Sequence, residues 1–373
     1  MVEPVLSVCI ASYNKAQTTT NLVKTILSNK NEKLAVVVVD NASTDNTIEC
    51  LKEIEDSRLK ILCNEFNIGG AANMVRAIYS GAGYCIYCND RDLIYPNKLD
   101  DFIDFLEKHP EYSCGWVSRY SLDCPTFYTE YELTQAFKTM CWRCEHPTGF
   151  FFNKNFLNKI EESYWDEYIN PNGWTAFPHE NIQAELVATG KFVRYNIPVW
   201  KSTGNETHKK YVGGFDSLKT DGVRWFFPQN CINRSKAYLM QFWKLCDKYN
   251  IQIEENVRYD IYSNIILSAH KIGIWRYKVI FSSKSLSYHY AVKPKHVPSK
   301  ELKKNSEVIT NELLKVIRDK ENKTSTFEKV TLRTINIYNK KMKRKLFLSK
   351  YLNKLMKIKM VQHLKEKVKS SLR

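Results

Sequence analysis

Cys85-Ile-Tyr-Cys-Asn89-Asp90-Arg91-Asp92-Leu-Ile-Tyr-Pro96 is a stretch in which an apolar run leads directly into two aspartates. Glycines before the run and a proline after it are typical of a short buried strand that enters a loop. Residues i and i+2 of an extended chain point to the same side, so Asp90 and Asp92 are expected to present two carboxylates to one point. Divalent cations such as Mg²⁺ take such oxygen ligands, and open α/β sheets bind ligands at this end of their strands. The alternative is a surface turn with two solvated acids.

The first 120 residues alternate between short apolar runs and helical patterns. Strands are expected at 5–10, 34–39, 59–63, 84–88 and 113–118. Helices are expected between them, at 18–28, from a cap at 43 or 44 to about 55, from the stretch 67–73 to about 80, and at 97–108. Ser43 or Thr44 is the expected cap of the second helix. This alternation predicts an open, mostly parallel sheet with helices on both faces.

The pattern becomes less regular after residue 120. A helix is expected at 180–189, stopped by Gly190, and strands are expected at 149–152, 192–195 and 197–200. Residues 201–214 are polar and rich in glycine, which predicts a mobile loop. Beyond residue 221 the chain is expected to be mostly helical.

The net charge of +16 is concentrated at the C-terminus. Residues 340–373 carry 13 Lys and Arg and one acid, a net +12 that leaves +4 for the other 339 residues. This near-neutral body has no patterned basic and aromatic surface, which argues against a nucleic-acid-binding protein. Apolar residues of the tail recur at spacings of one, three or four, as in a helix that lies on an anionic membrane: Leu348, Tyr351, Leu352, Leu355, Ile358, Val361, Leu364, Val368 and Leu372. The alternative is a helix that packs this stripe on a neighbouring domain or a partner chain.

Eleven cysteines are scattered without a disulfide framework. We expect no signal peptide and no membrane span, because no apolar run approaches 20 residues, and the thiols are therefore expected to be reduced. The pair Cys141 and Cys144, with His146 nearby, is only a weak indication of zinc.

Four motifs stand in a fixed order at the ends of the expected strands. They are Val5-Leu-Ser-Val-Cys-Ile-Ala11-Ser-Tyr13-Asn14, Val38-Val-Asp40-Asn-Ala-Ser-Thr-Asp45, Asn67-x-Gly69-x-x-x-Asn73 and Asn89-Asp-Arg-Asp92. Together they resemble the family 2 inverting glycosyltransferases of the GT-A fold. The resemblance covers roughly residues 5–200, and residues 215–373 take no part in it.

The resemblance implies a nucleotide-sugar donor site. Ala11 and Tyr13 match residues that line the nucleotide pocket, and Asp40 matches a carboxylate that contacts the base or ribose. The turn from Asn67 to Gly69 matches one that lies alongside the nucleotide, where glycine permits close backbone approach. UDP is the default nucleotide by family frequency, and no residue here selects it.

The resemblance also implies a metal, Mn²⁺ or Mg²⁺, that bridges the acidic motif to the diphosphate and neutralises the leaving group. Asp92 keeps its spacing to Pro96 and is the expected ligand. Asp90 is expected to bind the metal through water or to hold the ribose, and Arg91, which interrupts the acids, to pair with an acid or with the donor.

An inverting transfer needs one general base. By resemblance this is Glu180, at the start of the helix that ends near Gly190, although the usual aspartate is absent; His179 and Glu185 are the rivals. A structural role for Glu180 at the helix N-terminus is the alternative. His208 and Lys209 lie in the polar loop that often closes over the donor in this fold. Aromatic planes for the acceptor sugar are expected from Trp142, Trp165, Trp174 or Trp200, with core packing as the equal alternative.

These expectations combine into one interpretation. The chain divides into a GT-A domain at 1–215, with a nucleotide half at 1–120 and an acceptor half at 121–215, a helical region at 216–339 and a basic amphipathic tail at 340–373. The function is metal-dependent inverting transfer of a sugar to a glycan or lipid-linked acceptor of a bacterial surface polysaccharide, on the cytoplasmic face of the membrane. A nucleotidyltransferase is the other enzyme class, but the stretch after the first strand lacks its glycine-rich, Arg-containing loop.

Overall fold

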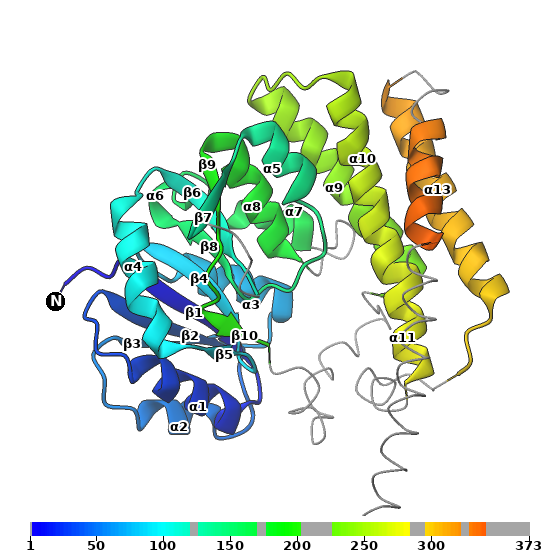
Figure 1. Ribbon diagram of the computed structural model, residues 1–373. Helices are drawn as coiled ribbons and strands as arrows, with labels where there is room; N and C mark the ends of the chain where they lie inside the picture. Colours follow the sequence, from blue (N-terminus) through cyan, green and yellow to red (C-terminus); the bar gives the residue numbers. More distant parts are fainter. Residues whose placement is uncertain are drawn as a thin grey trace, which may run out of the picture. The chain divides into compact units, whose positions relative to one another are not determined.

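The computed structural model describes residues 2–119, 126–169, 177–202, 226–283, 295–321 and 328–340. By contacts the chain divides into two compact units, Met1–Ile317 and Arg318–Arg373. Within the described residues, eight strands of the first unit form one sheet in the order β3-β2-β1-β4-β8-β6-β9-β7, and β5 and β10 form a separate pair (Figure 1).

The first half of the sheet is parallel, as predicted. It consists of β1 (Leu6–Ser12), β2 (Leu34–Asp40), β3 (Leu59–Cys63) and β4 (Tyr84–Asn89). The helices between and after these strands are α1 (Ala16–Leu27), α2 (Thr47–Lys52), α3 (Gly70–Tyr79) and α4 (Leu99–Lys108). Alternate residues of β1 share one apolar cluster with α1 and α4, whereas α3 packs against β1, β2 and β4 outside that cluster. Helices therefore cover both faces, and the predicted fold class is confirmed.

One predicted cap is wrong. The second helix begins at Thr47, because residues 43–46 form a turn instead of a first helical turn. The Ser43 side chain is engaged by Asp40, and Asp45 accepts the backbone N–H of Thr47 at 3.1 Å. Polar side chains that bond to nearby backbone in this way compete with helix formation.

The second half of the sheet is mixed. It contains β6 (Tyr112–Val117), β7 (Tyr128–Tyr131), β8 (Phe150–Asn153) and β9 (Lys191–Tyr195). Strand β8 runs antiparallel between β4 and β6, so the residues before Phe150 lie beside the carboxyl end of β4. The strand expected at 197–200 is reduced to β10 (Trp200–Lys201), which pairs with β5 (Leu93–Ile94). This pairing holds the chain that follows Asp92.

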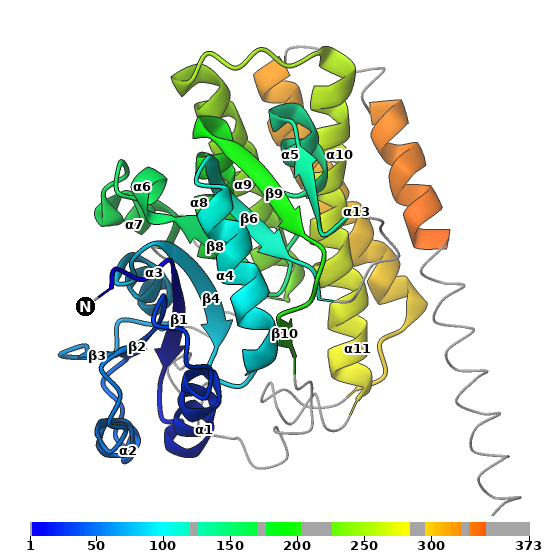
Figure 2. The same cartoon turned by 60° about the vertical axis from the view of Figure 1, so that its left-hand side comes forward.

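Helix α8 (Pro178–Thr189) lies against the second half of the sheet, and its residues from Pro178 to Val187 are all buried. It packs on β6, β8 and β9 and against α3, α5 (Leu133–Thr139) and α9 (Pro228–Lys248). Helix α10 (Glu255–His270) packs on α5 and α9 (Figure 2). The other helices are α6 (Lys154–Leu157), α7 (Asp166–Ile169), α11 (Tyr277–Ser282) and α13 (Ser299–Glu321), with 3₁₀ turns at Pro96–Lys98 and Glu162–Trp165, a π-helical segment at Lys271–Arg276 and a helix at 328–340. Among the described residues, no helix combines the length and apolar character needed to cross a membrane.

Candidate active site

The acidic motif lies in a turn, which corrects the expectation that it continues the strand. The backbone N–H of Asp92 donates to the carbonyl of Asn89 at 3.0 Å, closing a tight turn directly after β4. The same-side argument for i and i+2 residues therefore does not apply to Asp90 and Asp92. Asp90 is half-buried, whereas Asp92 is 2% exposed.

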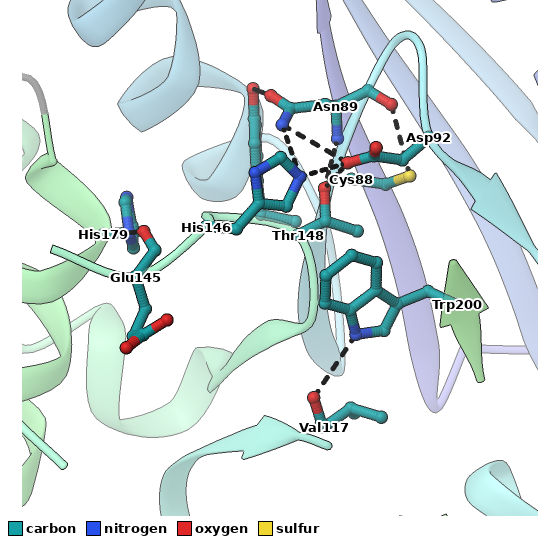
Figure 3. Close-up of polar contacts among 10 residues, drawn as sticks. Cys88, Asn89, Asp92, Val117, Glu145, His146, Thr148, His179 and Trp200 are labelled. Atoms are coloured by element: carbon teal, nitrogen blue, oxygen red, sulfur yellow. Dashed lines mark hydrogen bonds and ion pairs between the residues drawn. The ribbon is translucent and has the colours of Figure 1, made fainter. Parts of the chain in front are cut away.

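The carboxylate of Asp92 is held through one oxygen (Figure 3). The His146 ring nitrogen Nε2 and the Thr148 hydroxyl each lie 2.5 Å from Oδ2 and donate to it, and the Asn89 amide donates at 3.4 Å. No hydrogen bond reaches Oδ1 from the described residues. Burial raises the pKa of Asp92, but the hydrogen bonds and positive charge of His146, with Thr148 and Arg91, outweigh it and lower the pKa overall. Asp92 is therefore ionised at neutral pH.

Two of the three residues that hold Asp92, His146 and Thr148, belong to segment 146–149, which we call the strap. The strap runs along the carboxyl end of β4, because β8 is antiparallel to that strand. Sequence reasoning noted His146 only as a neighbour of two cysteines and did not find Thr148. Recognising that the expected strand at 149–152 runs antiparallel beside 84–88 would have placed both residues next to the acidic motif.

Three contacts fix the strap. The Thr148 hydroxyl, besides donating to Asp92, accepts the backbone N–H of Asn89 at 3.0 Å. The His146 ring stacks on Trp200, with centroids 5.4 Å apart and an interplanar angle of 20°. Gly149 has φ +97°, and a Cβ there would stand 2.3 Å from Nε1 of Trp200, so only glycine fits.

Asp90 and Arg91 lie beside a lysine that sequence reasoning missed. Burial raises the pKa of Asp90, and the positive charges of Lys15 and Arg91 oppose that rise. Burial lowers the pKa of Lys15, and Asp90 opposes that change. The loop after β1 therefore brings a cation to the acidic motif.

Glu180 occupies the first turn of α8 and is fully buried. Its Oε1 accepts the backbone N–H of Glu145 at 2.7 Å, so it is tied to the residue directly before the strap. Burial raises the pKa of Glu180, and hydrogen bonds from the backbone of Glu145 and Cys144 and from Tyr238 partly offset this.

The rival bases have other environments. His179 is fully buried, its Nε2 lies 3.3 Å from the Glu145 carbonyl, and burial lowers its pKa to about 3. Glu185 forms a 2.6 Å ion pair with Lys248 and accepts the hydroxyls of Tyr249 and Tyr164 at 2.8 and 2.9 Å. Glu185 thus connects α8 to the C-terminal end of α9 and to the 3₁₀ turn that contains Tyr164.

Asp40 closes a turn at the end of β2. It is fully buried, and it accepts the backbone N–H of Ser43 at 2.8 Å and the Ser43 hydroxyl at 2.5 Å. The same hydroxyl accepts the N–H of Asn14, at 2.8 Å. Asp40 therefore fixes the loops after β1 and β2 relative to one another. The half-buried residues Ala11 and Tyr13 lie at the carboxyl end of β1 and directly after it.

The turn from Asn67 to Gly69 is held by buried amides. Oδ1 of Asn67 accepts the N–H of Gly69 at 2.9 Å and the Asn41 side chain at 2.8 Å. Asn41 also accepts the N–H of Ile68 and the amide of Asn64, at 3.0 and 2.8 Å. Gly69 has φ +86°, and nothing lies within 4 Å of a Cβ built on it. The turn therefore has its rare backbone conformation and open space beside it.

The tryptophans expected at an acceptor site are core residues where the structure describes them. Trp142 and Trp165 are buried, and their indole N–H groups donate to Gln241 and to the Tyr79 hydroxyl. Trp200 is buried under His146. Trp174, His208 and Lys209 lie outside the described residues. Within the described ranges no three His, Cys, Asp or Glu side chains converge on a metal position, and this includes the Cys141 and Cys144 pair.

Comparisons with known proteins agree with the resemblance. A model of the family described as Glycosyl transferase family 2 matches residues 7–164. A Haemophilus influenzae protein named an uncharacterized glycosyltransferase is 30% identical over 298 residues, 70% of this chain and 87% of its own length. Escherichia coli WfaP, named a UDP-Glc:alpha-D-GlcNAc-diphosphoundecaprenol beta-1,3-glucosyltransferase, is 30% identical over 104 residues, 27% of this chain and 41% of its length. A crystal structure of S. aureus TarS 1-349 in complex with UDP is 14% identical with a TM-score of 0.45, covering 82% of this chain and 89% of that chain.

The family model and the Haemophilus influenzae relative define the class of protein. The chain is a glycosyltransferase, and it belongs to glycosyltransferase family 2.

Proposed function

We propose that this glycosyltransferase is metal-dependent and inverting, and that it moves a sugar from a UDP-sugar to a glycan or lipid-linked acceptor of a surface polysaccharide. The observation that carries the proposal is the ionised Asp92 at the carboxyl end of β4, with one oxygen engaged and the other free of hydrogen bonds from the described residues. WfaP, whose name specifies UDP-Glc and a diphosphoundecaprenol-linked sugar, supports the donor and acceptor classes.

The residues present fit a divalent cation. Mg²⁺ and similar ions are commonly held by one or two carboxylates and completed by substrate phosphates. Asp92 would supply the ionised ligand, with Asp90 beside it or acting through water. When bound, Mn²⁺ or Mg²⁺ would supply positive charge that neutralises the departing diphosphate.

Glu180 is the proposed catalytic base. A single displacement requires a carboxylate that accepts the proton of the acceptor hydroxyl as that oxygen attacks the anomeric carbon. Burial raises the pKa of Glu180 toward the range in which a carboxylate is an effective base. His179 is a poorer choice because burial lowers its pKa to about 3.

The donor is proposed to lie over the carboxyl ends of β1 and β2. Ala11 and Tyr13 would line the nucleotide pocket, Asp40 would contact the ribose or base or fix the loop that does, and the Asn67–Gly69 turn would flank the nucleotide. Arg91, His208 and Lys209 are proposed contacts of the diphosphate.

The basic tail, residues 340–373, is proposed to lie on the anionic inner face of the cell membrane. Its net charge of +12 and its apolar stripe are the pattern of an interfacial helix. Such an anchor would bring the enzyme to a lipid-linked acceptor.

A donor screen tests the proposed function. Purified enzyme is incubated with each common nucleotide-sugar, with Mn²⁺ or with EDTA, and release of the nucleoside diphosphate is measured. The proposal expects release from a UDP-sugar with Mn²⁺ and none with EDTA. Equal release in EDTA would overturn metal dependence, and release from another nucleotide-sugar alone would overturn the choice of UDP.

A further inference from the structure

We infer that His146 and Thr148 are positioning residues, which fix the carboxylate of Asp92 through Oδ2 and thereby present Oδ1 to the donor complex. The inference rests on the proposed role of Asp92, and it assigns the strap a function that the four sequence motifs do not contain.

Two side chains of the strap bond to the same oxygen of Asp92. His146 and Thr148 both donate to Oδ2 at 2.5 Å, from one side of the carboxylate (Figure 3). Asp92 closes the turn after β4 outside any helix, and these hydrogen bonds oppose rotation of its buried carboxylate. Hydrogen bonds to an ionised acceptor are short and strong, and two of them restrict that rotation.

The rigidity of the strap also supports the inference. Thr148 bonds to the backbone N–H of Asn89 as well as to Asp92, which joins the strap to the last residue of β4. The His146 ring is held flat on Trp200, and Gly149 fits closely against the same indole. Because the strap is fixed in this way, the His146 N–H and the Thr148 hydroxyl keep their positions. Fixed hydrogen-bond partners of this kind are what orient a metal-ligating carboxylate such as Asp92.

The residue directly before the strap also holds Glu180. The N–H of Glu145, one residue before His146, donates to Glu180 at 2.7 Å. The candidate base and Asp92 are thus attached to neighbouring residues of one segment. A shift of the strap would move both carboxylates together.

Paired substitutions in the full-length protein separate positioning from folding. Thr148→Val keeps the shape and removes the hydroxyl, whereas Thr148→Ser keeps the hydroxyl. His146→Leu removes the ring N–H that donates to Asp92, whereas His146→Gln retains an N–H near the position of Nε2. Binding of Mn²⁺, alone and with UDP, is measured by electron paramagnetic resonance, and thermal unfolding is recorded for each variant.

The control reproduces the same pair of side chains elsewhere. His270 of α10 and Thr310 of α13 form a buried His–Thr hydrogen bond of 3.0 Å in the helical region. Thr310→Val therefore removes a comparable hydroxyl without touching the strap. It is expected to leave Mn²⁺ binding at the wild-type level.

Loss of partners that orient a ligating group typically costs about 10- to 100-fold in metal affinity. Thr148→Val and His146→Leu are expected to weaken Mn²⁺ binding with UDP by that factor, while Thr148→Ser and His146→Gln stay within about threefold. Wild-type affinity in Thr148→Val and His146→Leu would overturn the inference, as would equal losses in the donor-retaining variants. Because the His146 side chain is 28% exposed, its pair of variants remains decisive if Thr148→Val fails to fold.

Asp92→Asn distinguishes this inference from the proposed function. If Asp92→Asn binds Mn²⁺ as the wild type does, or if the wild type binds none with UDP, the metal assignment fails and the strap inference fails with it. If Asp92→Asn loses binding and the strap variants do not, only the positioning role is overturned.

Discussion

The backbone N–H of Glu145 donates a 2.7 Å hydrogen bond to the buried carboxylate of Glu180. The bond joins the first turn of α8 to the chain directly before the strap. Glu180 therefore has a structural role whether or not it is the base. A useful test must keep this bond and remove only basicity.

Glu180→Gln meets that condition, because the amide oxygen still accepts the Glu145 N–H. If Glu180 is the base, the turnover number falls by about 10²- to 10⁴-fold while UDP affinity measured by calorimetry stays near the wild-type value. Steady-state kinetics with the donor found by the screen provide the measurement.

A control variant and a pH profile accompany the Glu180 test. Glu307→Gln changes an exposed acid of α13 and is expected to have no effect on turnover. Because burial raises the pKa of Glu180, wild-type activity should be lost as pH falls, at a pH above the ordinary pKa of glutamate. Glu180→Gln turnover within about threefold of wild type would contradict the assignment and return the role to His179 or Glu185.

Gly69→Ala is expected to weaken donor binding. Its backbone, with φ +86° and ψ 154°, belongs to a region that only glycine adopts readily, and strain of about 1–3 kcal/mol follows from a Cβ there. If the turn flanks the nucleotide, the KM for the donor rises by about tenfold. Gly70→Ala is the matched control, since a Cβ there also meets nothing within 4 Å but φ is ordinary. Equal kinetics in the two variants would exclude a role for this conformation.

The buried His270 predicts acid sensitivity of the fold. Burial lowers its pKa to about 4, so below the ordinary value of histidine the unfolded chain binds a proton that the folded chain does not. The stability that neutral His270 contributes to the fold is fully present above about pH 6.5 and is lost as pH falls toward about 4. At pH 5 the loss in the free energy of unfolding is on the order of 2 kcal/mol. The free energy of unfolding, measured in urea from pH 7 to 5, should fall less steeply in His270→Gln. Parallel pH curves would contradict this.

The basic tail predicts salt-sensitive membrane binding. Each Lys or Arg near an anionic surface contributes about 1 kcal/mol, screened by salt. The full-length enzyme should pellet with anionic liposomes at low salt and much less at high salt, whereas a chain truncated after Asn339 should remain in solution. Equal pelleting of the two forms, or pelleting that ignores salt, would exclude an electrostatic anchor. Aggregation of the truncated form would indicate instead that the stripe packs on protein.

The strands of the first half could be predicted because continuous apolar runs such as 34–39 admit few other structures. The position of Asp92 at the end of β4 was also predictable, since the polar residues 89–92 end the apolar run and Pro96 follows them. Its side-chain environment was not. The i, i+2 rule assumed an extended chain, and the hydrogen bond from Asp92 to Asn89 makes a turn.

The strap was missed for a different reason. His146 and Thr148 lie more than 50 residues from Asp92, and their contact depends on the antiparallel insertion of β8 between β4 and β6. Long-range pairing of this kind leaves no local periodicity. The burial of Trp165 also depends on tertiary packing that the sequence pattern does not specify.

The proposed function requires that sugar transfer depend on a divalent cation and on Asp92. The most direct measurement is the rate of nucleoside diphosphate release from the donor found by the screen, with Mn²⁺ and with EDTA, for the wild type, Asp92→Asn and the exposed control Asp104→Asn. The account predicts full, Mn²⁺-dependent release by the wild type and Asp104→Asn, and a loss of about 100-fold or more in Asp92→Asn. Release by Asp92→Asn within about threefold of wild type, or undiminished wild-type release in EDTA, would contradict it.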